Sequence, residues 1–189
     1  MTDKLLPENA HMIPEAAELV FKGTIFNVYH WQQEMFDGSF QTFEMLRRPD
    51  TTMVIVIDGD QIIVLDEQQP GTPMQYNRLA GGRVEPGELP CDAAKREIEE
   101  EIGMQFNDWA LLEVTQPALK IEWFAYVYVA VNKIKQGETA HEIGEKIAIK
   151  RVSFDKFKRA YEVHSDALRD IHSIDELLKK VKLSDNATS

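Results

Sequence analysis

The sequence predicts a layered α/β sandwich, in which helices cover the faces of an antiparallel or mixed β-sheet. Strands are indicated by Asp37-Gly38 and Asp58-Gly59-Asp60, because each lies between runs of β-branched and aromatic residues, as hairpin turns do. Helices are indicated from residue 90 onwards, where apolar residues recur at helical spacing. Since strands outnumber helices, we expect the helices to pack on the sheet.

The composition is that of one globular domain with an appended arm. The 189 residues are 43% hydrophobic and 28% charged. No apolar run approaches the ~18 residues that span a bilayer, and no signal-peptide pattern is present, so we expect a cytoplasmic protein. A single cysteine, Cys91, excludes an intramolecular disulfide. The net charge of −11 disfavours nucleic acid as a partner, whereas a phosphorylated small molecule can bind through divalent cations.

The first half of the chain predicts an arm followed by two β-hairpins. Residues 1–12 lack periodicity, and we expect them to be mobile. Two β-rich runs within residues 21–46 form the first hairpin, and strands over residues 52–57 and 61–65 form the second. Residues 68–87 are rich in glycine and proline and predict a loop.

The second half predicts three helices and two strands. The first helix covers residues 90–102, with Pro90 in its first turn and Gly103 at its end. Ser173 and Glu176 form a capping box at the start of the last helix. The other predicted elements are strands over 121–131 and 146–153 and helices over 154–161 and 174–182.

The helix predicted over residues 90–102 carries three carboxylates on one face. At about 100° per residue, Glu100 and Glu101 lie within one turn of Glu97. Arg96 precedes Glu100 by four residues, so the two side chains can pair. A neighbouring apolar stripe should dock on the sheet, and it consists of Cys91, Ala94, Ile98 and Ile102.

Three like charges on one helix face are unfavourable, by about 0.2–0.5 kcal/mol for each pair in an isolated helix. The repulsion grows if the face lines a partly dry cleft, and a cation should then compensate it. Carboxylate oxygens suit Mg²⁺, Mn²⁺ or Ca²⁺ rather than soft metals. The alternative is a solvated acidic face, which is what most runs of charge form.

The helix lies within a longer pattern of fixed residues. The pattern reads Gly82, five residues, Glu88, seven residues, Arg96-Glu97, an aliphatic residue, one residue, Glu100-Glu101, one residue, Gly103 and the aliphatic Met104. It matches the Nudix box at every specified position, and a chance match is on the order of one in 10⁸ per window. The chain therefore resembles the Nudix hydrolase family.

This resemblance implies an α/β/α sandwich with a mixed sheet and a loop–helix–loop metal site. Glu97, Glu100 and Glu101 match the family's metal-binding and catalytic carboxylates. The implied cofactor is Mg²⁺, with Mn²⁺ as a substitute. The implied reaction is attack of water on a nucleoside diphosphate that is linked to another moiety.

Residues around the carboxylates receive supporting roles from the same resemblance. Arg96 and Glu88 match positions that brace the motif by ion pairing, and Glu88 can also approach a metal. Gly81 and Gly82 would let the loop turn tightly and approach the phosphates of the substrate.

Outside the box, the layout resembles the branch of ADP-ribose and nucleoside-diphosphate-sugar pyrophosphatases. That branch has an N-terminal β arm, which commonly exchanges between subunits. We therefore expect residues 1–50 to form a dimerisation arm, residues 51–189 to form the catalytic domain, and the protein to be a homodimer. Gln68-Gln69-Pro70 is similar to a segment that often reads Gln-Tyr-Arg, but the arginine is absent here. ADP-ribose or a nucleotide sugar is the favoured substrate.

The general base of related enzymes is often a glutamate on a loop outside the box. Glu142 and Glu145 both precede the strand predicted from residue 146. We favour Glu145 as the base, from its resemblance to a Glu-x-Ile pattern, and expect Glu142 to contact the substrate. Glu100 or Glu101 could also serve as the base.

Other contacts to the substrate are inferred from proximity. Tyr76 and Arg78 precede the glycine loop and could contact the phosphates or the base. Aromatic residues of the strand predicted over 121–131 could stack a nucleobase or pack in the core, and these are Trp123, Phe124, Tyr126 and Tyr128.

Two other functions stay open at the level of sequence. The first is a non-catalytic Nudix-fold protein that binds a nucleotide or regulates a partner, against which the complete set of box carboxylates argues. The second is a hydrolase of dNTPs, dinucleoside polyphosphates or RNA 5′ ends. An RNA substrate needs a basic channel, and the net charge of −11 argues against one.

Overall fold

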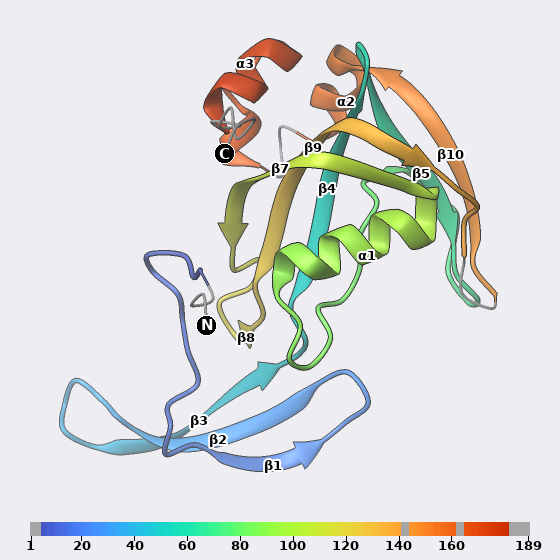
Figure 1. Ribbon diagram of the computed structural model, residues 1–189. Helices are drawn as coiled ribbons and strands as arrows, with labels where there is room; N and C mark the ends of the chain where they lie inside the picture. Colours follow the sequence, from blue (N-terminus) through green and yellow to red (C-terminus); the bar gives the residue numbers. More distant parts are fainter. Residues whose placement is uncertain (1–4, 141–143, 162–164, 182–189) are drawn as a thin grey trace.

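The computed structural model describes residues 5–140, 144–161 and 165–181. A large β-sheet lies between helices, and a smaller sheet formed by the N-terminal arm projects from one end (Figure 1). This arrangement confirms the predicted mixed α/β sandwich with an antiparallel arm. None of the helices in the described ranges is long and apolar enough to cross a membrane.

The larger sheet is mixed. Its strands are β4 (Thr51–Asp58), β5 (Gln61–Gln68), β6 (Gln75–Arg78), β7 (Met104–Thr115), β9 (Ala125–Gln136) and β10 (Lys146–Ser153). They follow the order β10-β5-β4-β9-β7, with β6 paired to β5. The central strands β4 and β9 pair in parallel, and the other pairs are antiparallel. Parallel pairs are stable where both faces of the sheet are covered.

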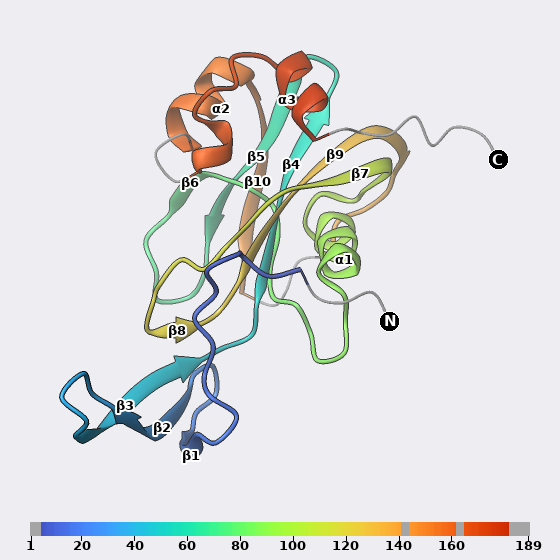
Figure 2. The same cartoon turned by 90° about the vertical axis from the view of Figure 1, so that its left-hand side faces the viewer.

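Helices cover both faces of this sheet (Figure 2). They are α1 (Pro90–Ile102) on one face and α2 (Phe154–Tyr161), a short 3₁₀ helix (Asp166–Leu168) and α3 (Ile174–Lys180) on the other. Alternation along β4 divides the core between the two faces. Val54 belongs to the cluster that contains Ile98 of α1, whereas the next residue, Ile55, belongs to the cluster that contains Phe157 of α2.

The arm is a sheet of three antiparallel strands with one short parallel strand added. Its strands are β1 (Glu18–Lys22), β2 (Asn27–Glu34), β3 (Phe40–Arg47) and β8 (Ile121–Glu122). The turn between β2 and β3 contains Gly38 in the left-handed region, at φ 79°, as the predicted hairpin requires. Because β8 lies just before β9, its pairing with β3 ties the arm to the central domain.

The N-terminal segment, which the sequence predicts to be a mobile arm, contacts the central domain at Leu5 and Ile13. The carbonyl of Leu5 accepts a hydrogen bond from the hydroxyl of Tyr126 at 2.9 Å. Ile13 is buried, and its N–H donates to the carboxylate of Glu122 at 2.6 Å. The apolar residues of this segment, among them Ala10 and Ile13, show no regular spacing, so its sequence does not predict these contacts.

Most element boundaries agree with the sequence, and the differences have physical causes. The bounds of α1, β10 and α2 are as predicted, and α3 ends at Lys180. The strand predicted over residues 121–131 divides into β8 and β9. The sequence predicts no strand at β7, because bulges at Gln105/Phe106 and Leu111/Glu113 break its alternation. Pairing with β5 makes β6 a strand despite its polar composition.

Candidate active site

Helix α1 is placed by its first residue, its last residue and its apolar face. Pro90 occupies the first turn, where a missing N–H removes no helical hydrogen bond. Gly103 ends the helix in the left-handed region, at φ 67°, with its N–H donating to the carbonyl of Glu99 at 3.0 Å. Ala94 and Ile98 are fully buried against the sheet. The acidic face is thereby turned toward the loop that precedes the helix.

Arg96 connects the carboxylates of this face. Its Nε and Nη2 donate to the two oxygens of Glu88 at 3.0 and 3.1 Å. Its Nη1 donates to Glu97 at 2.8 Å and to Glu100 at 3.1 Å, which includes the pairing that the spacing predicts. Nη2 also donates to the carbonyl of Arg83 at 2.9 Å, so the guanidinium holds the loop to the helix. The hydrogen bond from Arg96 lowers the pKa of Glu88.

The glycine loop packs directly on the carboxylates. The N–H of Gly81 donates to Oε2 of Glu101 at 2.8 Å. Gly81 has φ 144°, and a Cβ there would collide with the backbone of Thr52 and Met53 on β4. A Cβ on Gly82 would lie 2.5 Å from Cδ of Glu97. Only glycine therefore lets the loop backbone approach the helix this closely.

Glu101 is a box carboxyl group whose pKa is strongly shifted by its surroundings. Burial raises its pKa from 4.5 to about 8, against the opposing effect of the hydrogen bond from Gly81. The negative charges of Glu97, Glu67 and Glu145 raise it further. Without a cation nearby, this carboxyl group would hold a proton at neutral pH. Binding of a cation to this carboxyl group would therefore displace its proton.

A cleft of about 560 Å³ lies over these groups. Glu97, Glu100 and Glu101 line it from α1, and Glu67 lines it from the end of β5. The side-chain amide of Gln69 connects Glu67 with a further carboxylate, Glu145. Its Nε2 donates to Glu67 at 2.9 Å and to Glu145 at 3.2 Å. Carboxylates from three separate segments therefore face one another.

The chemistry of these donors fits a hard divalent cation. Carboxylate oxygens are the ligands that Mg²⁺ and Mn²⁺ take, and the missing Cβ of Gly82 lets the carboxylate of Glu97 lie against the loop backbone. Within the described ranges, no three acidic, histidine or cysteine side chains already converge to hold an ion. Two of the expected ligands, Glu97 and Glu100, instead contact Arg96. To bind a cation, Glu97 and Glu100 must therefore either contact the cation and Arg96 together or give up their contacts with Arg96.

The opposite wall of the cleft is cationic and aromatic. Arg48 follows β3 and lines the cleft together with Phe26 of the arm and Arg83 of the box. The guanidinium of Arg48 lies 4.5 Å from the ring centroid of Trp123 and 5.8 Å from that of Phe26. Burial and, secondarily, the charge of Arg83 lower the pKa of Arg48. The arm thus supplies part of the cleft, and it does so with groups that suit an anion and a flat ring.

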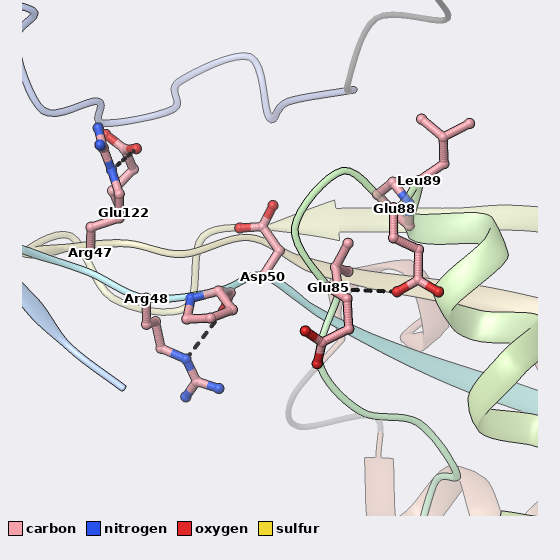
Figure 3. Close-up of a pocket in the computed structure, with 10 residues that line it drawn as sticks. Arg47, Arg48, Asp50, Glu85, Glu88, Leu89 and Glu122 are labelled. Atoms are coloured by element: carbon pink, nitrogen blue, oxygen red, sulfur yellow. Dashed lines mark hydrogen bonds and ion pairs between the residues drawn. The ribbon is translucent and has the colours of Figure 1, made fainter. Parts of the chain in front are cut away.

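A smaller hollow of about 320 Å³ adjoins the cleft and shares Arg48 and Glu85 with it. Figure 3 shows the end of β3 on one side of this hollow and the box loop, with Glu85 and Glu88, on the other. Arg47 donates to Glu122 at 2.6 Å at the far end. Glu122 also accepts a hydrogen bond from the N–H of Ile13, so it joins the N-terminal segment to Arg47. These contacts hold the chain beside Arg48.

The structure brings most of the sequence-predicted residues to one place. Those that line the cleft are Gly81, Gly82, Arg96, Glu97, Glu100, Glu101 and Glu145. Glu88 braces Arg96 and lines the adjoining hollow instead. Glu142 lies outside the described residues.

The other predicted substrate contacts lie elsewhere. Tyr76 and Arg78 line a cavity of about 360 Å³ beside α2 and are not among the residues that line the carboxylate cleft. Of the aromatic residues considered for stacking, Phe124, Tyr126 and Tyr128 are buried in the core. Trp123 lies beneath Arg48 and donates to the hydroxyl of Thr51 at 3.0 Å.

Sequence reasoning missed several residues of the cleft. Glu67 lies near the end of the apolar strand β5, and this position is its signal. Gln69 belongs to the Gln68-Gln69-Pro70 segment that the resemblance points out, but the sequence assigns it no role. Arg83 lies at an unspecified position of the box. Phe26 and Arg48 belong to the arm and its junction, which the non-local pairing of β3 with β8 joins to the domain.

Comparison with protein families gives a match to the model for the NUDIX domain over residues 47–171. The crystal structure of an ADP compounds hydrolase superposes with a TM-score of 0.67 at 23% identity, covering 86% of this chain and 91% of that one. This likeness shows that the two share a fold.

Three characterised relatives are similar in sequence. ADP compounds hydrolase NudE of Escherichia coli (strain K12) is 30% identical over 98 residues, covering 51% of this chain and 53% of that protein. Methanol dehydrogenase activator of Bacillus methanolicus is 29% identical over 127 residues, covering 65% and 68%. ADP-ribose pyrophosphatase of Bacillus subtilis (strain 168) is 28% identical over 89 residues, covering 47% and 48%. The chain spans about half the length of the first and third of these relatives.

Proposed function

This chain belongs to the NUDIX domain family, and from that premise we propose that it hydrolyses the diphosphate linkage of a nucleoside diphosphate derivative with Mg²⁺. One observation carries the proposal: the box carboxylates, the glycine loop and Glu145 line a single cleft. The names of two relatives, an ADP compounds hydrolase and an ADP-ribose pyrophosphatase, support the same reaction.

Glu97, Glu100 and Glu101 are the residues that would hold the cation. Bound Mg²⁺ would neutralise the diphosphate and lower the pKa of the attacking water. The N–H of Gly81 orients the carboxylate of Glu101, and Arg96 braces Glu97 and Glu100 on the helix. These contacts limit the motion of the carboxylates, so that a cation held by them would keep the diphosphate in one orientation.

Glu145 is the general base of this proposal. It lies across the cleft from α1, where Gln69 holds one of its oxygens at 3.2 Å. A carboxylate in that place can take the proton of a water molecule that attacks the diphosphate from the side opposite the helix. Glu101, with its pKa near 8 in the cation-free protein, is the alternative base.

The proposed substrate is ADP-ribose or a nucleotide sugar. Arg48 and Arg83 provide positive charge for the diphosphate, and the ring of Phe26 offers a flat surface for a nucleobase. A volume of about 560 Å³ falls within the range of small-molecule sites. A nucleic acid is a poor fit to this chain, because its net charge is −11.

We also propose that the arm mediates a homodimer. Large apolar side chains are exposed on it, and these are Leu19, Val20, Phe21, Phe36 and Phe40. Several exposed apolar residues on one small sheet are typical of an interface between subunits. Since Phe26 of the same arm lines the cleft, dimerisation would also stabilise one wall of the site.

A direct test is a hydrolysis screen of the purified full chain with ADP-ribose, ADP- and UDP-sugars, dinucleoside polyphosphates and dNTPs. Each substrate is incubated with Mg²⁺, with Mn²⁺ and with EDTA, and nucleotides are separated by chromatography. We expect ADP-ribose or a nucleotide sugar to give the nucleoside monophosphate in the presence of metal only. Absence of turnover of every substrate with either metal would contradict the proposal.

A regulatory protein is the second candidate function, because one relative is named methanol dehydrogenase activator. A regulator without turnover would bind a nucleotide in calorimetry and hydrolyse none of the substrates above. The box carboxylates favour the hydrolase, since a protein that only binds nucleotides does not need a cluster of acids that disfavours anions.

A further inference from the structure

Tyr161, the last residue of α2, bonds to the segment that leads into the glycine loop. Its hydroxyl accepts a hydrogen bond from the N–H of Leu79 at 2.7 Å and donates one to the carbonyl of Asn77 at 2.8 Å. Its ring stacks on Phe157, with 5.0 Å between centroids, which fixes the side chain from within α2. One phenol group therefore satisfies a backbone donor and a backbone acceptor two residues apart.

The backbone of the segment held by Tyr161 lies in the sheet, and successive side chains point to opposite faces. Leu79 is buried in the core cluster beneath α2, and the next residue, Ala80, is buried in the cluster beneath α1. Gly81 follows, and its N–H donates to the carboxylate of Glu101 at 2.8 Å. Two residues thus separate the amide that binds Tyr161 from the amide that binds a box carboxylate.

Other contacts hold different atoms of the same segment. The N–H of Asn77 donates to Asp66 at 3.1 Å, and the carbonyl of Ala80 accepts from the N–H of Val54 at 2.9 Å. Asn77 has φ 54°, in the left-handed region, which asparagine adopts more readily than most residues other than glycine. The carbonyl of this residue is one of the two groups that Tyr161 binds.

We propose that Tyr161 is a positioning residue of the hydrolase, whose hydroxyl fixes the backbone at Asn77 and Leu79 and so directs the N–H of Gly81 to Glu101. It acts from behind the sheet, because it lines the cavity beside α2 and not the carboxylate cleft. This inference rests on the proposed function, since Glu101 matters here as a carboxylate of that reaction. It adds a residue that lies outside the box and on the other face of the sheet.

Tyr161→Phe tests the inference, because it removes only the hydroxyl. Tyr126→Phe is the matched control: its buried ring loses a hydrogen bond to the carbonyl of Leu5, in the N-terminal segment. We expect kcat of Tyr161→Phe to fall on the order of tenfold, with KM within about twofold and a higher Mg²⁺ concentration at half activation. Both variants should show similar losses of stability in urea, whereas kcat should stay at the wild-type value in Tyr126→Phe.

The outcomes separate the inference from the proposed function. Equal kcat values and equal Mg²⁺ dependence for the two variants would overturn the role of Tyr161, whatever their stability. Absence of hydrolysis by the wild-type chain would count against the proposed function itself.

Amide hydrogen exchange on the wild-type protein provides a second measurement, which holds even if Tyr161→Phe does not fold. We expect the amide of Leu79 to be protected as strongly as that of Val54, which bonds the neighbouring Ala80 within the sheet. Exchange of the Leu79 amide at the rate of an open loop would show that the phenol does not hold this segment, and it would overturn the inference.

Discussion

Replacement of Gly82 by alanine should disable catalysis while the protein stays folded. The added Cβ would lie 2.5 Å from Cδ of Glu97, so the carboxylate must retreat by about 0.5 Å before this contact reaches even 3.0 Å. The obstructing group is the end of a flexible side chain, and Gly82 is not in the left-handed region. The loss of stability should therefore be about 1 kcal/mol. A misplaced cation ligand should lower kcat on the order of 10²-fold.

Gly137→Ala is the matched control for this variant. Its Cβ would meet the carbonyl of Gly103 at 3.6 Å, an ordinary contact, and its backbone is also outside the left-handed region. Both variants and the wild type would be assayed for kcat on ADP-ribose at saturating Mg²⁺ and for their urea midpoints. We expect Gly137→Ala to match the wild type in both. A Gly82→Ala enzyme with wild-type kcat would refute the link between Glu97 and the cation.

Four further predictions follow from the site and the arm. Glu100→Gln should lower kcat by ~10² or more, and near-normal turnover at saturating Mg²⁺ would remove Glu100 from the ligand set. Glu145→Gln should lower kcat much more than it raises KM, and an unchanged rate would move the base elsewhere. The pKa of Glu101 is raised to about 8 in the folded protein, so folding favours its protonated form. The free energy of unfolding of the metal-free protein should therefore fall by roughly a few kcal/mol as pH rises from about 4.5 to 8. Urea unfolding of Glu101→Gln in EDTA should show a smaller fall, and an equal fall would contradict this assignment. Deletion of residues 1–46 should give a monomer, and light scattering that finds a dimer would contradict the role of the arm.

The sequence predicts an element correctly where the pattern of its own residues indicates the same structure that its tertiary contacts stabilise. Helix α1 has a proline start, a glycine stop and one apolar stripe, and its observed bounds are the predicted ones. Strand β7 lacks a regular pattern, because two bulges shift its alternation relative to β9. Its pairing with β9 is decided by tertiary contacts that no window of its own residues reveals.

The same distinction applies to the site. Glu97, Glu100 and Glu101 lie within one helical turn, so local geometry alone places them together. Tyr76 and Arg78 illustrate the opposite case, since they are near the glycine loop in the chain but line a cavity beside α2. Neighbouring side chains there point to opposite faces of the sheet, as Leu79 and Ala80 do, so closeness in sequence misleads.

The distribution of charge in the cleft supports the proposed place of a cation near Glu101. The guanidinium of Arg96 already contacts Glu97 and Glu100 at about 3 Å. Glu101 is buried beyond them, and it has the negative charges of Glu67 and Glu145 as neighbours. Its pKa near 8 means that the positive charge around it does not suffice to keep it ionised at neutral pH. A divalent cation would replace the proton there, so Mg²⁺ binding should release a proton at pH 7 and tighten as pH rises.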